Sequence, residues 1–83
     1  MEHQVKEIMA YVFNMPVHKL KGELNTDTID NWDSLSHLSL IVELESAFNI
    51  TFTPQEIEDF KSLDKILSGI KDKISLRETN TES

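Results

Sequence analysis

Apolar residues recur at spacings of three and four in separate segments of this 83-residue chain, and this periodicity most constrains its fold. In the first segment the repeating residues are Val5, Ile8, Met9, Val12 and Phe13. Their spacing predicts an amphipathic helix over about residues 2–14, with one buried stripe. Pro16 restricts Met15 to extended conformations, so we expect the helix to stop there.

The segment 17–32 has no sustained period and is rich in Asn, Thr, Asp and Gly. Leu20, Leu24 and Ile29 are spaced through it as candidate anchors. We therefore expect a long loop that is pinned to the core at these three points. Such loops are uncommon in small domains and are often functional where they occur.

The stretch DNWDSLSHLSLIVELE, residues 30–45, opens the second periodic segment. Asp33 or Ser34 is a suitable N-cap, and the helix that follows is expected to continue to about Asn49. The expected stripe consists of Leu35, Leu38, Ile41, Val42 and Phe48, and the polar face of Ser36, Ser39, Glu43 and Ser46. Leu40, Leu44 and Ala47 widen the apolar arc, which predicts burial against more than one neighbour.

Two further helices are predicted in the last third of the chain. Thr53 and Glu56 form a capping-box pattern around Pro54, which predicts a short helix to about Phe60. Ser62 is placed to cap a fourth helix, whose apolar repeat consists of Leu63, Ile66, Leu67, Ile70 and Ile74. Gly69 within it indicates either close packing or an early weakening.

These elements predict an all-α fold: a small four-helix bundle of three long helices and one short, with a long loop between the first and second. The expected domain covers residues 1–76, and the polar segment 77–83, which has no period, is expected to be a disordered tail. The predicted core depends on Leu38, Ile41, Phe48, Phe60, Ile66 and Ile70.

Composition excludes several classes of function. The absence of cysteine removes disulfides, thiolate metal sites and a cysteine nucleophile. A net charge of −7 argues against nucleic-acid binding. No Lys or Arg lies between Lys21 and Lys61, so the middle of the chain is either a solubilising acidic surface or a docking face for basic partners. Without a secretory signal or a segment long enough to span a membrane, a cytoplasmic monomer is expected.

Ser34 is the serine whose position invites a chemical role. A hydroxyl on the first turn of a helix faces solvent beside free backbone N–H groups, where an esterified phosphate would be stabilised. The alternative is that Ser34 is simply the helix cap. His37 lies one turn further on, but a Ser-His hydrolase is disfavoured because the chain has no nucleophile-elbow pattern and little room for a substrate pocket.

The remaining candidate residues have structural interpretations. His37 is expected to face solvent, and Trp32 is expected to be an apolar anchor for the loop. His3, His18 and His37 lie on different elements without ligand spacing, so no metal site is predicted.

Asp33-Ser34-Leu35 at the start of an apolar helix resembles the Asp-Ser-Leu motif of acyl carrier proteins. The similarity extends over about residues 5–74, with the predicted helices in the family order. It implies that Ser34 Oγ receives phosphopantetheine from coenzyme A, delivered by a separate phosphopantetheinyl transferase that uses magnesium. The carrier itself would then catalyse nothing, and its working thiol would arrive on the prosthetic group and hold acyl groups as thioesters.

The resemblance also implies roles for neighbouring residues. Asp33 would orient the loop and help to dock the transferase, and Leu35 would seat the motif. The implied partner-docking face consists of Ser36, Ser39, Val42, Glu43, Glu45 and Ser46. Its partners would be an acyl- or aminoacyl-loading ligase and synthase or transferase enzymes with basic docking patches.

Trp32 and the three serines of this face depart from fatty-acid carriers, which usually have a small residue and often acidic residues there. We therefore expect a specialised biosynthetic pathway, or else fatty-acid or polyketide-type synthesis. Two other readings remain open. One is an aminoacyl or peptidyl carrier of a nonribosomal-type pathway, and the other is an unmodified helical interaction module.

Overall fold

The computed structural model describes the backbone of residues 1–82 and the side chains of residues 1–76. In this part of the chain the elements are α1 (Glu2–Phe13), the 3-10 helix η1 (Val17–Lys19), α2 (Ser34–Phe48), α3 (Pro54–Asp59) and α4 (Leu63–Glu82). The described residues contain no strand, only an isolated bridge between Asn25 and Ser62. The predicted all-α fold with four helices and a long first loop is therefore confirmed. The tail predicted for residues 77–83 lies outside the part described in full, and it stays a prediction.

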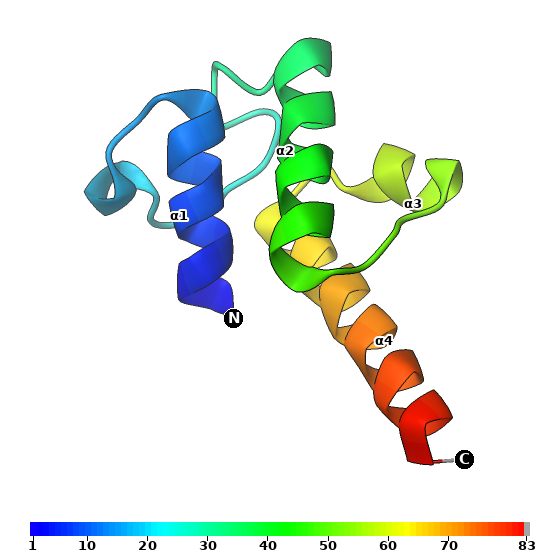
Figure 1. The fold of residues 1–83 in the computed structure, drawn as a ribbon. Coiled ribbons are helices and arrows are strands. Elements are labelled where there is room, and N and C mark those ends of the chain that lie inside the picture. The colour runs from blue at the N-terminus through cyan, green and yellow to red at the C-terminus, as the bar shows by residue number, and fades with distance from the viewer. Residues whose placement is uncertain (83) are drawn as a thin grey trace.

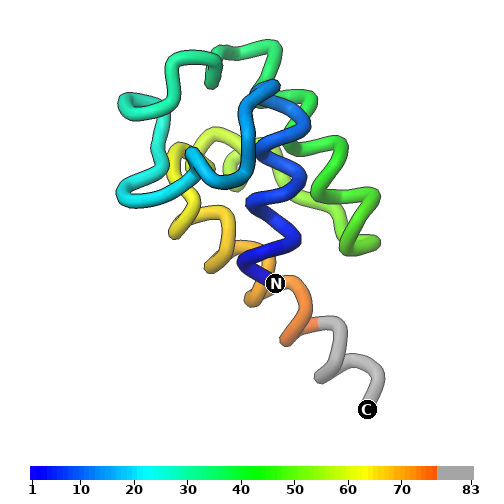
Figure 2. Tube along the Cα trace, turned by 90° about the vertical axis from the view of Figure 1, so that its left-hand side faces the viewer, coloured from blue at the N-terminus to red at the C-terminus, as the bar shows by residue number. Residues whose placement is uncertain are grey.

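The helices are arranged around α2. In Figure 1, α1 and α2 lie side by side with opposite chain directions, and the short α3 lies on the other side of α2. Figure 2 shows that the loop between α1 and α2 gathers at the same end of the molecule as the start of α2. No helix among the described residues is both long and apolar enough to cross a membrane.

One core joins all of these segments except the short helices. It contains Val5, Met9 and Phe13 of α1, Leu40, Ile41 and Leu44 of α2, Leu63, Ile66 and Ile70 of α4, the loop residues Leu20, Leu24, Ile29 and Trp32, and the linker residues Phe52 and Phe60. The three predicted loop anchors are thus buried, as expected. The predicted stripes of α1 and α4 are also confirmed, with Ile8, Val12, Leu67 and Ile74 partly buried at their edges.

Polar contacts fix the two ends of the long loop. At its start Asn14 adopts the left-handed conformation, with φ 54°, and its N–H bonds to carbonyls of the last turn of α1. Near its end, the amide of Asn31 donates to the carbonyl of Phe13 at 2.8 Å. In the middle, the Thr26 N–H donates to the Lys61 carbonyl at 3.0 Å, and the Leu63 N–H donates to the Leu24 carbonyl at 2.9 Å. The loop is therefore tied to both α1 and the start of α4.

The buried face of α2 differs from the predicted one. Leu40, Ile41 and Leu44 are buried, whereas Leu35, Leu38 and Val42 are exposed and Phe48 is only partly buried. The apolar residues of α2 lie around most of the helix, between its polar residues, so two stripes with comparable helical spacing were available. The expectation of a core role for Leu38 is wrong. Leu40 and Leu44, which were expected only to widen the apolar arc, are fully buried instead.

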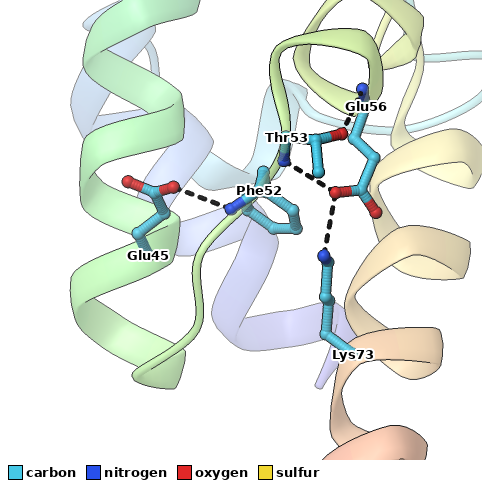
Figure 3. A network of polar contacts seen from close by, with 5 residues as sticks. All are labelled: Glu45, Phe52, Thr53, Glu56 and Lys73. Carbon is cyan, nitrogen blue, oxygen red and sulfur yellow. Dashed lines mark hydrogen bonds and ion pairs between the residues drawn. The ribbon is translucent and has the colours of Figure 1, made fainter.

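The predicted capping contacts at the starts of α3 and α4 are present. Figure 3 shows the capping box, in which the Thr53 N–H donates to Glu56 and the Glu56 N–H donates to the Thr53 hydroxyl. Lys73 of α4 lies 2.9 Å from the same Glu56 carboxylate, so this contact ties α3 to α4. Ser62 caps α4 by accepting the Lys65 N–H.

Gly69 is a position of close packing. A Cβ atom built on it would lie 2.6 Å from the ring of Phe60, closer than the two groups can tolerate. Of the two interpretations of this glycine, close packing is the correct one.

Candidate functional site

Ser34 is the first residue of α2, and its side chain is exposed. The N-cap is Asp33, in extended backbone conformation, whose carboxylate accepts the Ser36 N–H at 2.9 Å. This hydrogen bond holds the pKa of Asp33 below its usual range. Because Asp33 performs the capping, the Ser34 hydroxyl does not, and within the described residues its Oγ has no hydrogen-bond partner. The interpretation of Ser34 as the cap is therefore wrong.

Trp32 fixes the chain just before this turn. Its side chain is only 6% exposed, and its ring packs against Phe13 with centroids 5.1 Å apart. The predicted anchor is confirmed, but Trp32 also has a polar role that the sequence analysis missed. Its indole N–H donates to Nδ1 of His37 at 3.0 Å.

His37 is half-buried, and both of its ring nitrogens are engaged. Nδ1 accepts a hydrogen bond from Trp32, so the neutral ring carries its proton on Nε2, which donates to the Ile57 carbonyl at 2.7 Å. The expectation that His37 faces solvent is wrong. A tryptophan five residues before a histidine, across a helix N-cap, was the available signal for this contact.

These contacts also bear on the hydrolase alternative. Neither nitrogen of His37 is open to accept a proton from Ser34 Oγ, because one is acceptor to Trp32 and the other is donor to Ile57. Within the described residues, no group of three or more His, Cys, Asp or Glu side chains could hold a metal ion. The first turn of α2 therefore presents a hydroxyl without a neighbouring base.

An open groove of about 840 Å³ lies beside Ser34, between the first turn of α2, the end of α3 and the loop. Its lining consists of Thr26, Trp32, Asp33, Ser34, His37, Leu38, Glu58, Asp59 and Lys61. Three acidic residues and one basic residue thus line the space next to the hydroxyl. The Thr26–Lys61 backbone bond holds the loop against the chain that follows α3, so it positions two walls of the groove together.

The exposed face of α2 carries an apolar ridge, defined by Leu35, Leu38 and Val42, which are 76%, 57% and 62% exposed. Because their spacing is three and four, the three side chains lie on one side of the helix. Leu35 therefore does not seat the motif in the core, and Trp32 has that position instead. Leu35 and Leu38 lie on this exposed face, although their helical spacing from Ile41 predicted that they point inward.

The predicted docking residues divide into two groups. Ser39, Val42, Glu43 and Ser46 are exposed on or beside the apolar ridge. Ser36 is half-buried. Glu45 is also half-buried, and its carboxylate accepts the Phe52 N–H at 2.9 Å (Figure 3). The structure thus places four of the six residues together on the open surface.

No protein-family model matches this chain. Two D-alanyl carrier proteins, from two strains of Streptococcus suis, are 50% identical to it over 40 residues. The matched stretch is 46% of this chain and 51% of each relative, so the chain spans about half the length of the curated relatives it matches. This similarity supports a relationship to carrier proteins over part of the chain.

Proposed function

We propose that this chain is a carrier protein whose Ser34 Oγ bears phosphopantetheine and thereby holds acyl or aminoacyl groups as thioesters. The observation that carries the proposal is the exposed Ser34 hydroxyl on the first turn of α2, which has no hydrogen-bond partner among the described residues because Asp33 caps the helix. The similarity to D-alanyl carrier proteins supports the same class. The chain would present its cargo and leave catalysis to partner enzymes.

The local structure fits a phosphodiester at this position. The first turn of α2 offers free backbone N–H groups and the positive end of the helix dipole, both of which stabilise an attached phosphate. In the proposed modification Ser34 Oγ forms a bond to the pantetheine-bearing phosphorus of coenzyme A. The pyrophosphate P–O bond breaks, the adenosine bisphosphate half leaves, and the hydroxyl proton passes to a base of the transferase. An external base is needed because His37 is engaged on both nitrogens.

A second candidate narrows the cargo to an amino acid. The relatives are named for D-alanine, and Asp33, Glu58 and Asp59 outnumber Lys61 in the groove beside Ser34. A groove with this balance attracts the ammonium group of an aminoacyl thioester more than the carboxylate of a diacid. The loading partner would then be an aminoacyl ligase. Competition between an amino acid and a simple fatty acid, each offered with its own loading ligase, distinguishes the two kinds of cargo.

Modification of Ser34 tests whether this chain is a carrier protein. The purified chain is incubated with coenzyme A, magnesium and a promiscuous phosphopantetheinyl transferase, and its intact mass is measured. We expect one added phosphopantetheine on the wild type and on Ser39→Ala, but none on Ser34→Ala. Ser39 is a matched control because it is an exposed serine on the same helix. A wild type that several transferases fail to label would favour the unmodified interaction module.

A further inference from the structure

The Trp32–His37–Ile57 contacts, here called the relay, join three segments that are separate in the chain. Trp32 belongs to the end of the loop, His37 to the first turn of α2 and Ile57 to α3. The relay has one donor and one acceptor at each step: indole N–H to Nδ1, then Nε2–H to carbonyl. Only the neutral ring with its proton on Nε2 satisfies both steps.

A proton on Nδ1 is incompatible with this arrangement. The imidazolium ring has two N–H donors and no acceptor, so Nδ1–H would face the indole N–H across the present 3.0 Å contact. Two donors cannot bond to one another, and the ring would have to turn or move away. The bond between His37 and Ile57 depends on the same ring position, so it would be disturbed too.

Movement of His37 would affect the groove beside Ser34. Trp32 lines the groove from the loop, and His37 lines it from α2. Glu58 and Asp59, which directly follow Ile57, line it from α3. The charged groups around His37 are therefore Asp33 on its own side and Glu58, Asp59 and Lys61 on the opposite side. The position of α3 sets the distance between these two walls.

The short helix α3 has few buried contacts of its own. It is six residues long and has no fully buried side chain. Its own contacts with the rest of the molecule are the half-buried Ile57 side chain, the Glu56–Lys73 ion pair and the relay, while the buried Phe52 and Phe60 anchor the chain before and after it. An element with so few buried contacts opens at low free-energy cost.

We propose that the relay is a latch controlled by one proton. With His37 neutral, the latch holds α3 against α2 and keeps the groove beside Ser34 at its present width. A proton on Nδ1 releases α3 and widens the groove. The latch is proposed for the unmodified chain. Its test is therefore independent of whether Ser34 carries phosphopantetheine.

Amide hydrogen exchange of the ¹⁵N-labelled full chain tests the latch. Histidine changes charge between about pH 8 and pH 5, so exchange is measured by NMR at both ends of this range and corrected for the intrinsic pH dependence. We expect protection of the amides at the end of α3 to fall about tenfold at the acid end, as the loss of one hydrogen bond predicts. Protection in α1 should stay constant.

Two variants make the test specific. Trp32→Phe keeps a ring on Phe13 but removes the indole donor, so a proton on Nδ1 meets no opposing N–H. His37→Gln offers one acceptor and one donor, and it does not titrate. Both variants should show α3 protection that is independent of pH, with melting curves confirming that they are folded at both pH values. The latch is refuted if wild-type protection at α3 does not change with pH, or if the change persists in both variants.

Discussion

The Glu45 carboxylate accepts the backbone N–H of Phe52 at 2.9 Å and so joins the last turn of α2 to the linker before α3 (Figure 3). Phe52 is buried in the core, and its ring meets that of Phe60 edge-on at 4.8 Å. Glu45 therefore acts on the fold, although its sequence position suggested a residue that partners would contact.

Removal of the Glu45 carboxylate should destabilise the protein. Glu45→Ala leaves the Phe52 N–H without its acceptor in a partly buried position, which costs about 1–3 kcal/mol of unfolding free energy. Glu45→Gln keeps an amide oxygen there and should lose less. Urea denaturation measures both, and Glu43→Ala, at an exposed position of the same helix, should change stability by no more than about 0.5 kcal/mol. Equal losses for Glu45→Ala and Glu43→Ala would show that the bond contributes nothing.

Two aliphatic residues that were both predicted to lie in the core, Ile66 and Leu38, should behave differently. Ile66→Ala removes a fully buried side chain and should cost about 2–5 kcal/mol. Leu38→Ala changes an exposed side chain and should leave the unfolding free energy within about 0.5 kcal/mol of wild type. Thermal melting separates the two cases. A large loss with Leu38→Ala would mean that the predicted inward stripe of α2 was right after all.

The difference between these two residues shows what the sequence could determine. The caps at Thr53 and Ser62 were predictable because few other structures share these capping patterns. The loop anchors were predictable because an isolated apolar residue in a polar segment is usually buried. The buried face of α2 was not, because its apolar residues surround most of the helix. The position of Ser34 followed from the sequence, whereas the roles of His37 and Glu45 depend on Ile57 and Phe52, which only the tertiary fold brings near.

Gly69 should resist the substitution that usually stabilises a helix. Alanine gains about 1 kcal/mol of helix propensity over glycine, but its Cβ would lie 2.6 Å from the Phe60 ring. We expect the overpacking to outweigh the gain, with a net loss of about 1–3 kcal/mol. In a Phe60→Leu background the same substitution should cost less, and a double-mutant cycle by urea denaturation measures this coupling. Additive effects would contradict direct contact between the two positions.

Acid should weaken the fold through two capping carboxylates. Backbone N–H donation from Ser36 lowers the pKa of Asp33, and donation from Thr53 with the help of Lys73 lowers the pKa of Glu56. Because these carboxyls have lower pKa values in the folded chain, their stabilisation is complete above the unfolded values of about 3.9 and 4.3 and is lost as the pH falls through the folded values.

The measurement is the urea midpoint between about pH 5 and pH 2.5, a range that includes the unfolded values of both carboxyls. Asp33→Asn and Glu56→Gln keep side chains that can cap a helix but do not titrate. The double variant should therefore show a smaller decline with acid than the wild type. A decline of the same size would assign the acid sensitivity to other carboxylates.

The apolar ridge of α2 should be needed for encounter with partner enzymes. Leu35, Leu38 and Val42 are exposed beside Ser34 and make up a continuous contact surface with few charges, the kind of surface that forms the centre of protein interfaces. Because Val42 is 62% exposed, Val42→Glu should not disturb the core. A carboxylate there would have to be desolvated in any complex that covers the ridge. We expect KM for phosphopantetheinyl transfer to rise about tenfold, equivalent to about 1.4 kcal/mol, with the melting temperature unchanged.

Tyr11→Glu is the matched control, since Tyr11 is 77% exposed on α1, away from the ridge, and this variant should react as the wild type does. If the two variants gave the same KM, the ridge would not be the surface that the transferase contacts.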